Sequence, residues 1–166
     1  MGDDDYVEYV TARLPALHRL AYALTGDPHR ADDLVQQTIT TLYVKWAKVR
    51  RVEHPDRYVR SMLVNTFVDE RRLAWSRVRL FAQPPERPAP DDYRAERTAV
   101  RQALARVPRR QQAVLVLRFF YDLPVAEVAE ILGVTPGTVK SQTAHGLTAL
   151  RKLLGEQSVT ALTKER

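Results

Sequence analysis

Residues 123–142 combine side chains that suit nucleic-acid binding with the turn signals of two short helices. A first helix is predicted to open at Pro124, and Gly133 can adopt the left-handed conformation that ends it. Thr135 followed by Pro136 predicts the cap and the first residue of a second helix. A short helix, a glycine turn and a capped second helix form the helix-turn-helix pattern, whose second helix enters the DNA major groove.

The second of these helices has an apolar face and a polar face. On the polar face, Lys140 and Ser141 can each donate to guanine or to phosphate, and Ala144 can touch a thymine methyl. The uncapped backbone amides near Thr138, in the first turn of the helix, suit a phosphate. His145 completes the set expected to face DNA. The alternative is a helical hairpin with a solvated polar face.

Four of the ten prolines lie between Pro84 and Pro90, in a stretch that cannot continue a helix. Both flanks show helical spacing, and neither shows the sustained alternation typical of strands. We therefore predict an all-α fold of two small domains, residues 1–75 and 95–166, joined by a proline-rich linker over 76–94. The alternative is a surface loop within one domain.

The apolar spacing also predicts which residues face the core. One helix is expected to end at Gly26, a second to begin after the Asp27-Pro28 cap, and a third to begin near Pro55. The predicted inward residues are Ala31, Leu34, Val35, Thr38, Leu42 and Trp46 in the second helix, Tyr58, Val59, Met62, Thr66 and Phe67 in the third, and Ala99, Val100, Ala103, Leu104, Val107, Ala113, Val116, Leu117 and Phe120 in the later half.

The charge is unevenly distributed. The chain carries a net charge of +6, with 11 basic and 11 acidic residues in 1–75 but 11 basic and 6 acidic in 95–166. A basic half favours an anionic partner such as nucleic acid. Arg109 and Arg110, at a predicted helix start, are expected to contact DNA phosphates.

Other classes of protein fit the composition poorly. The chain has no cysteine, and its four histidines show no paired spacing, so we expect neither disulfides nor a metal site. No cofactor is expected. No apolar run approaches the length of a membrane span, and the first residues are acidic where a secretory signal would be basic and then apolar. We expect a cytoplasmic protein without membrane insertion.

These motifs resemble a known family. Residues 107–115 and 132–141 resemble region 4 of the extracytoplasmic-function sigma factors of the sigma-70 family, in particular its actinobacterial sigma-E-like group. Residues 32–38 resemble the polymerase-binding helix of region 2, and residues 58–65 with 69–72 resemble its melting and −10-reading helix. The two regions occur in the family's order around a linker, so the resemblance spans most of the chain.

The resemblance implies one protein-binding surface. In the family, the exposed side of the helix that follows the Asp27 cap docks on the clamp coiled coil of the polymerase's largest subunit. Here this side carries Asp33, Gln36, Gln37 and Thr40. A polar docking patch is physically reasonable, because transient interfaces are about as polar as ordinary surface. A merely solvated helix face is the alternative.

The resemblance also implies a single-strand DNA site in the N-terminal half. Single-strand binding requires phosphate attraction together with pockets for unstacked bases. The residues assigned to −10 recognition and melting are Arg57, Arg60, Asn65, Asp69 and Arg72. Asp69 matches the family's usual Asp, but a structural pairing with Arg72 is equally consistent with the sequence.

The chain departs from the family at several positions. Ser61 and Gln142 stand where arginine is frequent, and His145 and Leu147 stand where basic residues are common. The −35 contact is therefore expected to be less cationic than usual. Arg118 matches a family position that contacts −35 DNA from the preceding helix, and is expected to compensate.

The resulting expectation is a non-enzymatic sigma factor. Its partners would be core RNA polymerase, promoter DNA that is double-stranded at −35 and melted at −10, and an anti-sigma factor. Two alternatives remain open: a conventional repressor or activator, and a hydrolase or transferase with an appended DNA-binding domain. Co-purification with core polymerase separates the first from a sigma factor. The second needs a convergent set of ionisable groups in residues 1–75, and the sequence offers none.

Overall fold

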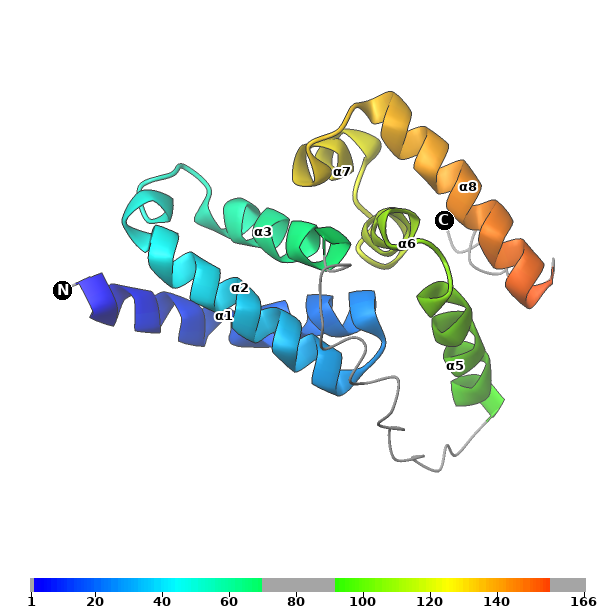
Figure 1. Ribbon diagram of the computed structural model, residues 1–166, viewed down its shortest axis with the longest axis horizontal. Coiled ribbons are helices and arrows are strands. Elements are labelled where there is room, and N and C mark those ends of the chain that lie inside the picture. Colours follow the sequence, from blue (N-terminus) through cyan, green and yellow to red (C-terminus); the bar gives the residue numbers. More distant parts are fainter. Residues whose placement is uncertain (1, 70–91, 156–166) are drawn as a thin grey trace.

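The computed structural model describes residues 2–69 and 92–155 of the chain (Figure 1). Within these ranges every regular element is a helix, which confirms the predicted all-α fold. The elements are α1 (Gly2–Thr25), α2 (Pro28–Val49), α3 (Pro55–Asp69), α5 (Asp92–Ala105), α6 (Arg109–Leu115), the π-helix η2 (Val116–Phe120), α7 (Val125–Leu132) and α8 (Pro136–Leu154).

The helices α1 and α2 form a hairpin with α3 packed against it (Figure 1). Gly26 makes the turn with a φ of 68°, a conformation that glycine adopts without steric cost. The Asp27 carboxylate then accepts hydrogen bonds from the amides of His29 at 2.8 Å and Arg30 at 3.3 Å, which starts α2. All six residues predicted for the inward face of α2 are buried.

The buried face of α3 differs from the prediction. Val59 and Phe67 are buried as expected, but Leu63 and Val64 are buried as well. The reason is that α3 packs between two layers, with α1 and α2 on one side and α6 and α7 on the other. The buried face of α3 is therefore rotated from the predicted stripe. Three residues of the predicted stripe are only half-buried: Tyr58, Met62 and Thr66.

The first of the C-terminal helices begins slightly earlier than predicted. Helix α5 starts at Asp92, so the last residues of the predicted linker are helical, whereas 76–91 lie outside the described residues. Ala103, Leu104 and Val107 are buried as expected. Val100 is only half-buried and Ala99 is exposed, so the predicted stripe is wrong at its first residue, in the first half of α5.

The expectation that Phe120 lies in the core is wrong, since it is 49% exposed. The chain from Val116 to Phe120 is a π-helix, in which the amide of Tyr121 donates to the carbonyl of Val116 at 3.2 Å. An i→i+5 bond widens the turn and breaks the 3.6-residue spacing on which the prediction rested.

The division into two domains stays a prediction, and a fragment tests it. Residues 95–166 contain their own apolar contacts, in which α6 packs on α8 around the buried Leu115 and Leu150. We expect this fragment to give a helical circular-dichroism spectrum with a cooperative thermal transition. A fragment that is unfolded while the whole chain is folded would contradict the two-domain assignment.

Candidate nucleic-acid interface

The predicted helix-turn-helix is present in α7 and α8. Gly133 ends α7 with a φ of 64°, and the amide of Val134 donates back to the carbonyl of Ala129 at 3.1 Å. The Thr135 hydroxyl accepts from the amide of Thr138 at 3.1 Å, and Pro136 is the first residue of α8. This is the glycine stop and threonine cap that the sequence indicated.

Four of the five residues expected to face DNA on α8 are exposed: Lys140, Ser141, Ala144 and His145. Thr138 differs, because it is half-buried and its hydroxyl lies 2.9 Å from that of Thr135. Its amide is already bonded to the cap, so the expectation that this amide is available to a phosphate is wrong. The exposed polar face of α8 begins at Lys140.

A glycine that sequence reasoning did not single out sets how closely α8 approaches α6. Gly146 is buried, and a Cβ placed there would lie 2.9 Å from Cδ1 of Leu115. A glycine in a helix interior costs about 1 kcal/mol relative to alanine. A glycine at such a position in the sequence therefore indicates that another element packs closely there. The contact fixes the orientation of the exposed face.

The predicted polymerase-binding residues share one exposed side of α2. Asp33, Gln36, Gln37 and Thr40 are all exposed, whereas the opposite side of the helix is buried in the core. One turn beyond Thr40, Val44 is 80% exposed and adds an apolar group to the same surface.

The residues predicted for −10 DNA are divided by their surroundings. Arg57 and Asp69 are exposed. Arg60, by contrast, forms an ion pair at 2.7 Å with Glu127 of α7, and both side chains are nearly three-quarters buried. Asn65 donates to the Ser61 carbonyl at 2.7 Å and to the carbonyl of Ile131 at 2.9 Å. Arg72 lies outside the described residues, so its expected pairing with Asp69 stays a prediction.

Further side chains of the C-terminal helices bind the ends of α1 and α3. Arg109 donates to the carbonyl of Phe67 at 3.0 Å and its guanidinium lies 5.3 Å from the centre of the Phe67 ring. The buried Gln112 donates to the carbonyl of Leu24 at 2.7 Å. The carbonyl of Leu24 lies in the last turn of α1, where carbonyls lack intrahelical donors, so Gln112 satisfies it. Arg109 therefore has a protein partner where the sequence suggested a DNA phosphate.

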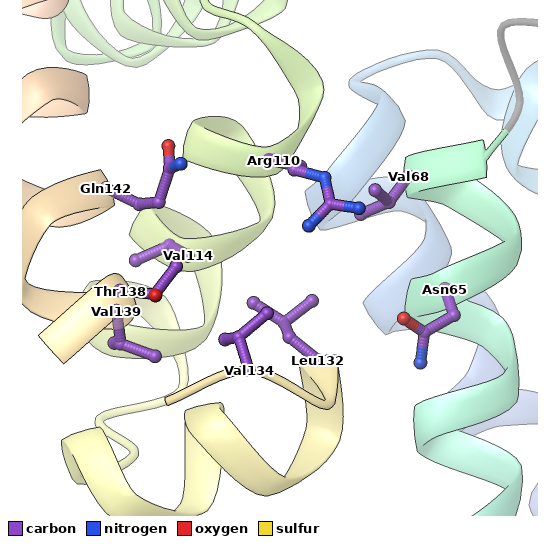
Figure 2. Close-up of a pocket in the computed structure, with 9 residues that line it drawn as sticks. All are labelled: Asn65, Val68, Arg110, Val114, Leu132, Val134, Thr138, Val139 and Gln142. Atoms are coloured by element: carbon purple, nitrogen blue, oxygen red, sulfur yellow. The ribbon is translucent and has the colours of Figure 1, made fainter. Parts of the chain in front are cut away.

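Between α3 and the helix-turn-helix lies a small cavity (Figure 2). Figure 2 shows Arg110 extending from α6 toward Val68 of α3, with Leu132 and Val134 contributed by the turn. Among the described residues, nine line it: Asn65, Val68, Arg110, Val114, Leu132, Val134, Thr138, Val139 and Gln142.

Arg118 is half-buried at the end of η2. Its guanidinium donates to the carbonyl of Leu123 at 3.1 Å and so holds the turn that leads to α7.

The contact of Arg60 and Asn65 with α7 was not anticipated from the sequence. Glu127 was expected on a helix surface, and 67 residues separate it from Arg60. No local pattern signals a pairing over that distance. Within residues 2–69 and 92–155, no three His, Asp or Glu residues gather as metal ligands would, and no helix is long and apolar enough to cross a membrane.

Comparison with known proteins agrees with this arrangement. Residues 9–77 match sigma-70 region 2, and residues 97–150 match sigma-70 region 4. The chain is 31% identical to the RNA polymerase sigma-E factor of Streptomyces avermitilis, over 98% of this chain and 92% of the relative. It is 32% identical to the ECF RNA polymerase sigma factor SigL of Mycobacterium tuberculosis, over 87% and 85%.

A solved structure is similar in fold. The sigma factor RpoE of Bartonella quintana, in complex with the anti-sigma factor NepR, superposes with a TM-score of 0.65 at 22% identity, over 92% of this chain and 98% of that one. The two sigma regions, with the exposed face of α8, define a transcription-initiation factor. The chain belongs to the sigma-70 family, and within it to the extracytoplasmic-function group.

Proposed function

We propose that this sigma factor uses three surfaces to direct core RNA polymerase to promoters. The exposed side of α2 binds the polymerase through Asp33, Gln36, Gln37 and Thr40. Helix α3 and the residues that follow it in the sequence read and hold the separated −10 strand, with Arg57, Arg60, Asn65, Asp69 and Arg72 as contacts. The exposed face of α8 reads the −35 element as duplex.

One observation carries the −35 assignment. The helix-turn-helix leaves Lys140, Ser141, Ala144 and His145 exposed together at the start of α8, on the side opposite its buried residues. These are donors and a methyl group that suit base edges and phosphates in the major groove. Arg118 supports this surface by holding the turn before α7, and Thr138 by extending the cap of α8.

In this proposal the protein carries out no catalytic step of its own. It contributes binding energy for promoter recognition and strand opening, and the polymerase performs phosphoryl transfer. We propose that it works in the cytoplasm, where polymerase and chromosome meet, and that an anti-sigma factor is among its partners.

Run-off transcription with purified core polymerase tests the proposal directly. Adding the chain to core polymerase and a fragmented genomic template is expected to give discrete transcripts that core polymerase alone does not give. A conventional repressor or activator would instead bind duplex operator DNA by itself and yield no new transcripts with core polymerase.

The docking surface is tested by introducing negative charge at two exposed, neutral amide side chains. Replacing Gln36 and Gln37 together with Glu is expected to weaken binding to core polymerase by at least about tenfold, since buried unmatched carboxylates are costly at an interface. Affinity is measured by fluorescence anisotropy, and circular dichroism checks that the helix content is unchanged.

The matched control for this variant is Gln102→Glu, which adds the same kind of charge at an exposed position on α5. It is expected to leave the affinity within about twofold of the original, because rim or remote charges act mainly through long-range steering. Equal affinities for the double variant and the control would remove α2 from the docking surface.

A further inference from the structure

The middle of α8 meets α6 at a residue that has no side chain. Gly146 is buried, and a Cβ placed there would lie 2.9 Å from Cδ1 and 3.1 Å from Cγ of Leu115. Ordinary contacts between carbon atoms are about 3.5–4.0 Å long, so a single methyl group exceeds the space by roughly half an ångström. Glycine is also unfavourable in a helix interior. The close approach of α8 to α6 therefore depends on glycine at this position.

Leu115 has little room to move aside. It has 2% of its surface exposed, and its neighbours Val114 and Val116 are buried as well. Protein interiors are packed as densely as organic crystals, so a second leucine rotamer would need space that other side chains fill. On the same side, the Cβ of Gln111 would lie 3.4 Å from the added atom. A methyl group at position 146 is therefore expected to displace α8 from α6.

Gly146 lies behind the face of α8 that we assign to −35 reading. This reading face consists of Lys140, Ser141, Ala144 and His145. A helix turns by about 100° per residue, which places Gly146 about 170° around the helix from the centre of the reading face. The other buried residues of α8, Val139 and Leu150, lie on the same side as Gly146. The place where Gly146 meets α6 thus sets how far the reading face stands out from that helix.

We propose that Gly146 is a positioning residue for −35 recognition. Its missing side chain seats α8 close to α6, and this seat determines how far the reading face projects from the helices behind it. In a helix-turn-helix the first helix crosses the DNA backbone while the second enters the major groove, so the depth of insertion depends on that projection. The inference rests on the proposed function, because it takes the exposed face of α8 as the −35 reader.

A displaced α8 loses base contacts before it loses attraction to phosphate. Hydrogen bonds weaken outside donor–acceptor distances of about 2.7–3.2 Å, so a shift of roughly half an ångström matters for Lys140 or Ser141 at a base edge. The attraction of basic residues to the phosphate backbone carries no sequence information and depends far less on exact distance. A larger residue at position 146 is therefore expected to keep general affinity for DNA and to lose preference among −35 sequences.

The test moves one carbon atom between the two residues in contact. Gly146→Ala adds a methyl group, Leu115→Val removes one carbon from the facing side chain, and the double variant keeps the total volume constant. Volume-conserving changes are the ones that cores tolerate best. Binding of the reconstituted holoenzyme is measured on a −35 substitution library at several salt concentrations.

Unfolding in urea separates crowding from helix propensity. Gly137→Ala is the matched control, because it makes the same substitution in the same helix at an exposed position, where the new Cβ would lie 3.9 Å from Oγ1 of Thr135. Gly137→Ala is expected to leave the midpoint unchanged or to raise it, since alanine favours the helix and meets no crowding. Gly146→Ala is expected to lower the midpoint despite the same gain in propensity.

We expect Gly146→Ala to narrow the range of affinities across the library by about fivefold while the salt slope stays the same. The double variant is expected to recover the original range to within about twofold, and Leu115→Val alone to stay within the same limit, because neither is crowded. If Gly146→Ala is too unstable to assay, Gly146→Ser in the Leu115→Val background is compared with the double variant instead, with the same narrowing expected.

The outcomes that overturn the proposal differ from the one that overturns the proposed function. If the variant with the larger residue keeps the full range of affinities, or if the double variant fails to recover it, the contact with Leu115 does not position the reading face, and the −35 assignment is untouched. If the original protein itself shows no preference across the library, α8 does not read the −35 element, and the proposed function fails at this surface together with the role of Gly146.

Discussion

Replacing Phe67 with alanine is expected to destabilise the protein by about 3–5 kcal/mol. Phe67 is the largest fully buried side chain in the described part of the chain, with 1% of its surface exposed. Its ring lies beneath the Arg109 guanidinium, so the substitution removes an apolar contact with the C-terminal helices as well as core volume. Domains of this size are stable by only about 5–15 kcal/mol, so the loss is a large share of the total.

Urea denaturation followed by circular dichroism measures this loss. The control is Val68→Ala, the next residue of α3, which is half-buried at the edge of the cavity and is expected to cost about 1 kcal/mol. A cost below about 1.5 kcal/mol for Phe67→Ala would mean that the core around the end of α3 collapses to fill the space.

The local features of the fold were predictable because their causes are local. A glycine able to take a positive φ, a threonine cap and a proline at the first helical position are encoded within a few residues, and Gly133, Thr135 and Pro136 play these parts. The buried face of α2 followed directly from its 3.6-residue spacing, since that helix has one neighbouring layer.

The failures have two other causes. Phe120 was misplaced because a π-helix changes the residue spacing locally. Leu63 and Val64 were missed because α3 is covered on two sides by segments far apart in the chain, and periodicity does not report such packing.

The same reason limits prediction of the site. Exposure of Lys140 and Ser141 follows from the helix-turn-helix pattern, but the pairing of Arg60 with Glu127 connects two helices through the tertiary fold. Sequence resemblance supplies roles for residues one by one. It does not say which of them are bonded to each other in the free protein.

Substitution of Lys140 is expected to separate base reading from phosphate attraction. Lys140 is exposed in the second turn of α8, where side chains of a helix-turn-helix reach base edges. If it reads a base, Lys140→Ala should cost about 1–3 kcal/mol of promoter affinity and relax preference at one or two −35 positions. A phosphate contact would instead weaken all sequences about equally and lower the salt slope by about one.

The measurement is binding of the reconstituted holoenzyme to a −35 substitution library at several salt concentrations. Lys152→Ala is the matched control, because it removes the same charge from the exposed C-terminal end of the same helix. It is expected to change affinity only slightly and without sequence preference, since a remote charge acts through the screened long-range field. Uniform weakening by Lys140→Ala across the library would make Lys140 a phosphate contact, and would leave Ser141, Ala144 and His145 as the residues that read the −35 bases.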